Sequence, residues 1–340
     1  MHRWLETLIL APDARGRAFP GPSIPNDEAM VMVRLTSRSG RLCAAALIAL
    51  GSAAAPASGQ QLDSAATRLV DVDGHAIRVR ALGLERRTRG RPIVVFEAGA
   101  TNSLEAWNAV VSRVAAFAPV VAYDRSGLGR SAWDGITPTP RHVTNRLRRL
   151  LETIGAEPPY VLVGHSWGGM LARYFAGYHP HDIAGLVLVD PAPMITQSLE
   201  DNLTPFNAVG AGRAGFDAFW SGYAAFFVNS PPAVRAEFGV FTGLLTKDLD
   251  ERDLRPLPDV PLVVLVAAKP FPSPPSLSLP YDPRAQFDAE LRYRIGVLQE
   301  WALGSSRGMV VVSNHVSHVI PREDPELVAW AVRHVLAPGR

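Results

Sequence analysis

The sequence predicts an α/β fold in which a mostly parallel β-sheet lies between two layers of helices. Short runs of β-branched and other apolar residues recur along the chain, and helical stretches separate them. Runs of about four to six such residues are typical of strands that are buried on both faces. Strands separated by helices indicate parallel βαβ units with right-handed crossovers. The expected strands are residues 93–96, 120–123, 160–163, 186–189, 262–266 and 309–312.

An antiparallel hairpin is predicted ahead of the first parallel strand, at one edge of the sheet. Residues 67–72 and 75–81 alternate apolar and polar side chains on either side of Asp73-Gly74. Asp-Gly between two alternating segments is a strong signal for a two-residue hairpin turn.

One connection departs from the alternation of strands and helices. Between Asp190 and Pro261 there is no strand signal, but the segment is rich in aromatic residues. A structureless loop of that length is implausible in a compact domain. Residues 192–258 are therefore predicted to form a helical lid over the carboxyl edge of the sheet, inserted between core segments 61–191 and 259–340.

The composition is that of a globular protein and disfavours some function classes. The 340 residues are 47% hydrophobic and 19% charged, with a formal net charge of +2. Nucleic-acid-binding proteins usually carry a clustered basic stripe. The densest basic run, residues 141–149, is typical of a solvated helix face, so no nucleic-acid partner is expected. The only cysteine, Cys43, excludes an intrachain disulfide or a cysteine-based metal cluster.

The first sixty residues are expected to lie outside the fold. Residues 30–60 resemble a signal peptide, because three arginines precede an apolar run and Ala53-Ala54-Ala55 suits cleavage. The run is about 14 residues at most, short of the ~20 that span a bilayer. A secreted or periplasmic location without a stable membrane span is therefore predicted. Since Met30 opens this signal, residues 1–29 are interpreted as an upstream or non-native extension.

A nucleophile is predicted at Ser166. Gly164-His165-Ser166-Trp167-Gly168 fits the pattern G-x-S-x-G and lies between an expected strand and an expected helix at 169–178. A serine on such a tight turn needs small neighbours, because Cβ atoms would clash there. The helix N-terminus also brings partial positive charge to a developing oxyanion.

Residues from about 90 to 336 resemble the α/β-hydrolase fold superfamily, in its bacterial serine-esterase-like branch. Four segments in family order carry the resemblance: FEAGA at 96–100, YDRSGLGRS at 123–131, GHSWG at 164–168, and His318 followed by PELV at 325–328. The resemblance implies a Ser–His–acid triad that acts through an acyl-enzyme. It implies no cofactor and no metal.

The resemblance places the general base at His318. In the family the histidine stands seven residues before a proline that opens the last helix, and Pro325 is at that distance. Asp324 is a suitable N-cap for that helix, with proline at its first position. His315 is the alternative.

The acid has two candidates. In most relatives it follows the strand that matches 262–266, but here no acidic residue follows until Asp282. Some relatives place the acid one strand earlier, and Asp190 ends that strand. Asp190 is preferred, and Asp282 stays open.

The resemblance also implies an oxyanion hole formed by two backbone N–H groups, those of Trp167 and Ala100. Glu97, at the end of a buried strand just before Ala100, needs a charged partner. Arg125 is the expected partner, in a structural ion pair that supports this loop.

Together these features predict a serine hydrolase that cleaves small to medium apolar carboxylic esters. The aromatic-rich insertion favours an apolar pocket. Two other activities of the same triad stay open: amide or N-terminal peptide cleavage of the proline iminopeptidase type, which also favours Trp after the nucleophile, and lactone hydrolysis. A non-catalytic binding protein of this fold is less favoured. The expected partner is a small-molecule ester, and the sequence does not specify an oligomeric state.

Overall fold

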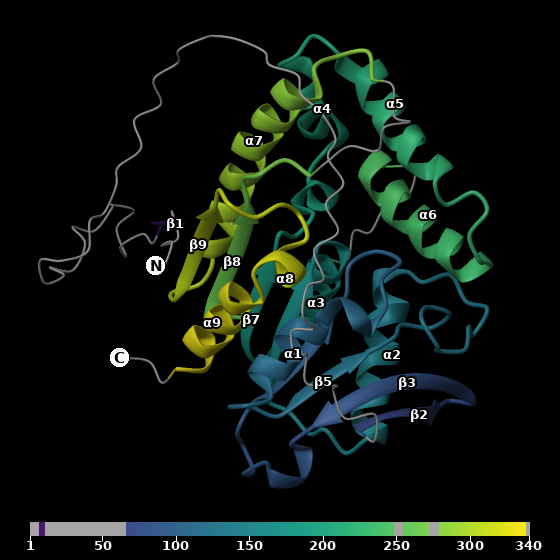
Figure 1. Cartoon of the computed structure of the whole chain (residues 1–340), viewed down its shortest axis with the longest axis vertical. Helices are drawn as coiled ribbons and strands as arrows, with labels where there is room; N and C mark the ends of the chain where they lie inside the picture. The colour runs from purple at the N-terminus through teal and green to yellow at the C-terminus, as the bar shows by residue number, and fades with distance from the viewer. Residues whose placement is uncertain (1–6, 11–65, 248–253, 272–278, 338–340) are drawn as a thin grey trace, which may run out of the picture.

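A nine-stranded β-sheet runs through the protein with helices on both of its faces, as the computed structural model shows (Figure 1). The structure describes residues 7–10, 66–247, 254–271 and 279–337. The strands are β1 Thr7–Leu10, β2 Thr67–Val72, β3 His75–Leu82, β4 Ile93–Glu97, β5 Val120–Tyr123, β6 Tyr160–His165, β7 Ile183–Val189, β8 Leu262–Ala267 and β9 Gly308–Ser313.

The strand order across the sheet is β1-β9-β8-β7-β6-β4-β5-β3-β2. Strands β4 to β9 are mutually parallel, whereas β3 pairs antiparallel with β5 and β2 pairs antiparallel with β3. The β2–β3 turn has positive φ at both central residues, 50° at Asp73 and 82° at Gly74, which is the conformation that favours Asp-Gly. The predicted fold class, a mostly parallel sheet with an antiparallel hairpin at one edge, is confirmed.

The helices divide between the two faces of the sheet. They are α1 Asn108–Val114, α2 Pro140–Thr153, α3 Trp167–Tyr178, α4 Leu199–Asn207, α5 Gly212–Ala225, α6 Pro232–Thr246, α7 Pro283–Leu303, α8 Ile320–Glu323 and α9 Pro325–Leu336. Helices α2, α3 and α7 pack into one apolar core, and α1, α8 and α9 pack into the other. Adjacent strand residues alternate between the cores: Val95 contributes to the first, and Val94 and Phe96 to the second. This alternation is why the central strands are apolar at every position.

Helices α4, α5 and α6, here called the cap helices, lie between β7 and β8 in the chain. In Figure 1, α5 and α6 stand at the upper right, apart from the helices that flank the sheet. Ser198 begins α4 with a capping box, in which its hydroxyl accepts the Asp201 N–H. The cap is tied to the core through Phe241 of α6, whose ring lies 5.7 Å from that of Trp167. Residues 192–247 thus form the helices that the sequence predicted for this insertion.

Of the first sixty residues, the structure describes only Thr7–Leu10, which pair antiparallel with β9 as strand β1. The expectation that the first sixty residues lie outside the fold is wrong for these four, because their backbone groups extend the sheet beyond β9. The expected signal peptide, residues 30–60, lies outside the described residues. Among the helices that the structure does describe, none combines the length and the apolar character that a membrane crossing requires.

Candidate active site

Ser166 lies between β6 and α3, at the carboxyl edge of the parallel strands. Its backbone has φ 54° and ψ −119°, a conformation that non-glycine residues rarely adopt. The Ser166 N–H donates to the Val189 carbonyl at 3.0 Å, and the Ser166 carbonyl accepts the Gly169 N–H at 3.0 Å. Such local strain persists only where surrounding contacts enforce it, and it is typical of functional turns.

Two glycines make this turn possible. A Cβ on Gly164 would lie 2.2 Å from the Gly168 carbonyl oxygen. A Cβ on Gly168 would lie 2.2 Å from the carbonyl oxygen of Glu97, at the end of β4. Both contacts are far inside van der Waals distance, so the glycines of G-x-S-x-G let the turn close against itself and against the neighbouring strand.

His318 and Asp190 are joined by a hydrogen bond. The His318 Nδ1–H donates to Asp190 Oδ2 at 2.7 Å. A carboxylate only accepts, so this bond fixes the proton on Nδ1 and leaves the Nε2 lone pair available as a base. The Asp190 side chain is 2% exposed, and that of His318 is 40% exposed. The imidazole therefore faces the solvent-accessible site while its acidic partner is buried behind it.

The second oxygen of Asp190 is held by two other donors. Asp190 Oδ1 accepts the Ala267 N–H at 2.9 Å and Arg294 Nη1 at 3.0 Å. Burial alone would raise the pKa of Asp190, but the Arg294 guanidinium, the His318 ring and the Ala267 amide hold that pKa well below its ordinary value. Asp190 is thus an ionised carboxylate with both of its oxygens hydrogen-bonded.

His165, the residue before Ser166, supports the backbone of His318. Its Nε2–H donates to the His318 carbonyl oxygen at 2.7 Å, and the two rings lie 4.8 Å apart. Burial, reinforced by the nearby His318 ring, lowers the pKa of His165 to about 3. His165 is therefore neutral near pH 7 and acts as a fixed hydrogen-bond donor.

The two alternative residues lie elsewhere. His315 contacts Ser313 Oγ through Nδ1 at 2.9 Å and Asp324 through Nε2 at 3.1 Å. Asp282 is the N-cap of α7, where its carboxylate accepts the Arg284 N–H at 2.9 Å. The structure therefore brings His318 together with Asp190 and gives His315 and Asp282 other partners.

The two expected oxyanion donors lie in the elements that surround Ser166. Trp167 is the first residue of α3, and Ala100 lies in the loop after β4 and lines the same cavity as Ser166. The predicted ion pair beneath that loop is present, with Arg125 Nη1 2.6 Å from Glu97 Oε1. Both side chains are almost fully buried.

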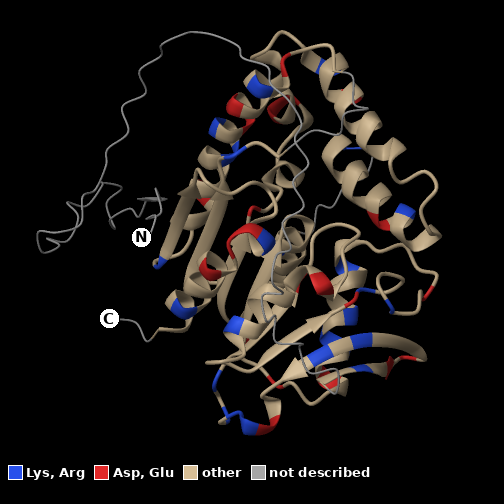
Figure 2. Cartoon of the chain, viewed as in Figure 1, with Lys and Arg blue, Asp and Glu red and all other residues tan. Residues whose placement is uncertain are grey.

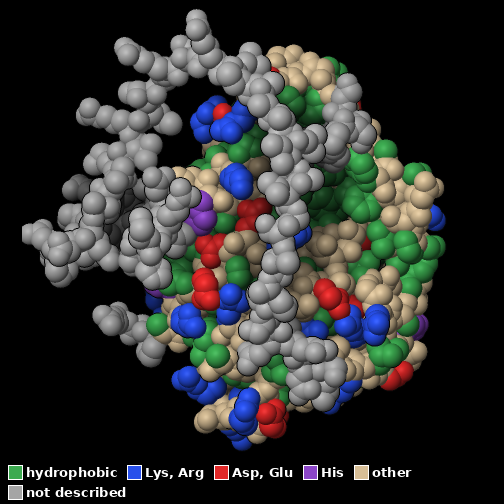
Figure 3. Space-filling model, in the orientation of Figure 1, with side chains coloured by type: hydrophobic (Ala, Val, Ile, Leu, Met, Phe, Trp, Pro, Cys, Tyr) green, Lys and Arg blue, Asp and Glu red, His purple; other side chains and the backbone are tan. Residues whose placement is uncertain are grey.

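A cavity of about 750 Å³ opens over Ser166 and His318, within the ~300–1,000 Å³ range of small-molecule sites. Its cap side is aromatic: Phe219, Trp220, Tyr223, Phe227, Phe238 and Phe241. Figure 3 shows hydrophobic side chains around the hollow beneath α5 and α6, and Figure 2 shows few charges on those helices. The opposite side carries charged residues, among them Lys269, Arg284, Glu290 and Arg294.

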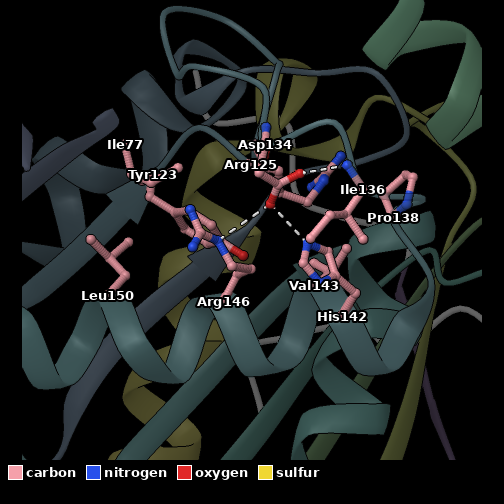
Figure 4. Close-up of a pocket in the computed structure, with 11 residues that line it drawn as sticks. Ile77, Tyr123, Arg125, Asp134, Ile136, Pro138, His142, Val143, Arg146 and Leu150 are labelled. Atoms are coloured by element: carbon pink, nitrogen blue, oxygen red, sulfur yellow. Dashed lines mark hydrogen bonds and ion pairs between the residues drawn. The ribbon is translucent and has the colours of Figure 1, made fainter. Parts of the chain in front are cut away.

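A second cavity holds another histidine–carboxylate pair but has no room for a substrate. His142 Nε2 lies 2.8 Å from Asp134 Oδ2, and Arg146 Nε is 3.5 Å from the same oxygen (Figure 4). Ser126 borders this cavity, and its hydroxyl accepts the Asp134 N–H. The volume is about 20 Å³, enough for about one water molecule. This cluster is therefore structural.

Three residues of the site were missed by sequence reasoning. Arg294 contacts Asp190, His165 contacts the His318 backbone, and Glu237 of α6 contacts Arg125. Only Glu237 left a local signal, because it interrupts an apolar helical stripe that includes Ala233 and Phe241. A carboxylate on such a stripe indicates a buried cationic partner.

The activity should rise with a single ionisation as the pH increases from about 4.5 to about 9. The pKa of Asp190 is held below this window, and that of His165 lies at about 3, so neither changes charge within it. Neither Asp190 nor His165 should therefore contribute a proton to the acid limb of the profile. A plot of log kcat/KM against pH tests this, and a limb steeper than unit slope would contradict it.

Known proteins share this fold and sequence pattern. The protein YqjL of Bacillus subtilis strain 168, whose function is uncharacterised, is 32% identical over 121 residues, 36% of this chain and 46% of YqjL. Lipase LipV of Mycobacterium tuberculosis is 42% identical over 74 residues, 22% of this chain and 28% of LipV. The matched segment thus spans less than half of either relative.

A solved structure of the epoxide hydrolase CorEH superposes with a TM-score of 0.52 and 17% sequence identity, covering 81% of this chain and 99% of that one. At that identity the likeness concerns the fold alone. The sequence model of the alpha/beta hydrolase fold matches residues 92–262, half of the 340-residue chain. The strand order, the strained serine turn and this match agree, and the protein belongs to the α/β-hydrolase fold family.

Proposed function

We propose that the protein is a serine hydrolase that cleaves carboxylic esters through an acyl-enzyme. The observation that carries the proposal is the His318–Asp190 hydrogen bond of 2.7 Å at the mouth of the cavity that Ser166 lines. A serine nucleophile also sets this chain apart from epoxide hydrolases and dehalogenases of the same fold, which use an aspartate.

In the proposed mechanism, His318 Nε2 takes the Ser166 proton while Oγ attacks the ester carbonyl. The tetrahedral oxyanion accepts hydrogen bonds from the Trp167 and Ala100 amides. His318 then donates its proton to the departing alcohol, which leaves the acyl group on Ser166. A water molecule, deprotonated by the same imidazole, releases the acid and restores the hydroxyl. Ionised Asp190 stabilises the imidazolium in both steps.

The cavity favours apolar esters of small to medium size. Six aromatic side chains of the cap border it, and its volume suits a small molecule. The Trp167 side chain gives no support to the peptidase alternative, because it is fully buried and packs against Phe241. Glu290, the carboxylate in the cavity lining that a substrate amine would need, lies 3.7 Å from Arg294 and accepts a hydrogen bond from the Gln286 amide.

Two further features belong to this proposal. The cap helices would act as a lid, since α5 and α6 contribute the aromatic border of the cavity. Secretion or export to the periplasm is inferred from the signal-like pattern at residues 30–60.

An ester panel tests the substrate class. The full-length protein should hydrolyse p-nitrophenyl esters, with turnover highest for small to medium acyl chains, and the chain-length optimum across acetate to laurate reports the depth of the cavity. Aminoacyl-p-nitroanilides, assayed in parallel, should be turned over at least ~10²-fold more slowly, because the acidic side chains among the described residues that line the site, Asp190 and Glu290, are already paired with Arg294. Turnover of anilides alone would replace the esterase proposal with a peptidase.

A further inference from the structure

Arg125 lies beneath the loop that follows β4 and binds two successive carbonyl groups of it. Its side chain is 3% exposed. Nη1 donates to the Ala98 carbonyl at 2.7 Å, and Nη2 donates to the Gly99 carbonyl at 2.6 Å. The planar fork of a guanidinium suits this arrangement, whereas a lysine ammonium cannot hold both carbonyls in the same fixed geometry.

This contact, together with the Asn102 N–H that donates to the same Gly99 carbonyl at 3.2 Å, fixes which way the Ala100 N–H points. In a trans peptide the carbonyl and the N–H of one unit point in opposite directions. The Gly99 carbonyl and the Ala100 N–H belong to the same unit, and that carbonyl is directed at Arg125. The Ala100 N–H is therefore directed away from Arg125. Ala100 lines the cavity over Ser166 and Arg125 lies behind the loop, so we expect the Ala100 N–H to be directed toward the cavity.

Two buried carboxylates hold Arg125 in place. Glu97, at the end of β4, lies 2.6 Å from Nη1 and also accepts the Tyr123 hydroxyl. Glu237 binds the other edge of the guanidinium, with Oε2 2.6 Å from Nε and Oε1 2.8 Å from Nη2. Each of the three charged side chains is at most 4% exposed. The guanidinium has no room to change its orientation while both carboxylates are present.

Glu237 also binds the loop directly and comes from the cap. Its Oε1 accepts the Thr101 N–H at 2.6 Å, where Thr101 has a φ of 62°. Because Glu237 belongs to α6, one carboxylate joins the cap to the arginine and to the residue that follows Ala100. The position of the cap helix and the orientation of the Ala100 amide are therefore mechanically linked.

We propose that Arg125 and Glu237 are positioning residues that orient the Ala100 N–H as an oxyanion donor, so that oxyanion stabilisation depends on docking of the cap helix α6. This inference rests on the proposed function. The inference gives the cap a role in the chemical step, in addition to its role as a border of the cavity. It also predicts that substitutions of Arg125 and Glu237 change kcat more than KM.

Two variants test the proposal. Arg125→Lys should lower kcat by about 10²-fold, close to the loss of one oxyanion donor, with KM changed less than about 2-fold. Glu237→Gln keeps the Glu97–Arg125 pair and should fold. It should lower kcat about 10-fold, because the amide NH₂ takes the place of Oε2 and faces the Arg125 Nε–H, so two donors oppose each other where the carboxylate accepted. If Arg125→Lys fails to fold, the kcat of Glu237→Gln alone tests the proposal.

The second measurement separates positioning from a loss of stability. A trifluoromethyl ketone that adds to Ser166 forms an oxyanion in the same hole, so its inhibition constant should rise in proportion to the loss of kcat/KM. The matched control is Asn202→Ala, which removes buried cap hydrogen bonds to Met194 and Leu245 but does not touch the loop. It should lower the melting temperature and leave kcat unchanged.

Three outcomes would overturn the inference. Variants with wild-type kcat and inhibitor affinity would show a purely structural network. An equal loss of kcat in Asn202→Ala would trace the effect to general loosening of the cap. If a fluorophosphonate fails to label Ser166 in the wild type, the proposed function fails first, and this inference fails with it.

Discussion

Ser166→Ala is expected to abolish ester hydrolysis, with kcat falling by about 10⁵- to 10⁶-fold, as in other enzymes whose catalytic serine is removed. The attacking oxygen is lost, so neither the acyl-enzyme nor its hydrolysis can occur on this chain. The fold should survive. Alanine and serine both carry a Cβ, so the steric strain at φ 54° is the same for both, and Gly164 and Gly168 still close the turn. The melting temperature should stay within a few degrees of the wild type.

Covalent labelling provides the second readout. A fluorophosphonate should attach one group to the wild type and none to Ser166→Ala, as measured by intact-protein mass spectrometry. Ser126→Ala is the matched control, since Ser126 also lies near a histidine–carboxylate pair but in a cavity of about 20 Å³. It should keep both labelling and turnover. Full activity in Ser166→Ala would remove the serine-hydrolase proposal.

Much of the fold could be predicted from the sequence, because its determinants are local. Buried parallel strands must be apolar on both faces, so the run at 160–163 is visible without any structure. The glycines around Ser166 are required by contacts within a single turn. His318 was found through its distance from Pro325, which begins α9 as predicted, with Asp324 as the N-cap.

The electrostatic partners could not be predicted, because they depend on tertiary contacts. Arg294 meets Asp190 across 104 positions of the chain, and Glu237 meets Arg125 across 112. Nothing near Arg294 in the sequence distinguishes it from the other arginines of α7, which are exposed or half-buried. The choice between Asp190 and Asp282 was open for the same reason. The loop after β9 carries His318, and the order of the strands determines which carboxylate that loop reaches.

Asp190→Asn should lower kcat by about 10⁴-fold, through the tautomer of His318. Oδ1 of Asp190 accepts two donors, Arg294 and the Ala267 N–H, whereas among the described residues Oδ2 accepts a hydrogen bond from His318 alone. The single oxygen of asparagine should therefore stay with the two donors, and its NH₂ group should face His318 Nδ1. That nitrogen must then accept, the ring proton moves to Nε2, and the base for Ser166 is lost.

Asp282→Asn is the matched control, because it makes the same chemical change at the other candidate acid. Asparagine is as good an N-cap as aspartate, so α7 should keep its start, and both stability and kcat should stay near the wild type. The Ser166 nucleophile is intact in both variants, so loss of fluorophosphonate reactivity in Asp190→Asn alone would report the missing base. The reverse pattern, with Asp282→Asn inactive and Asp190→Asn active, would transfer the role of the acid to Asp282 and require the α7 N-terminus to move toward His318 during turnover.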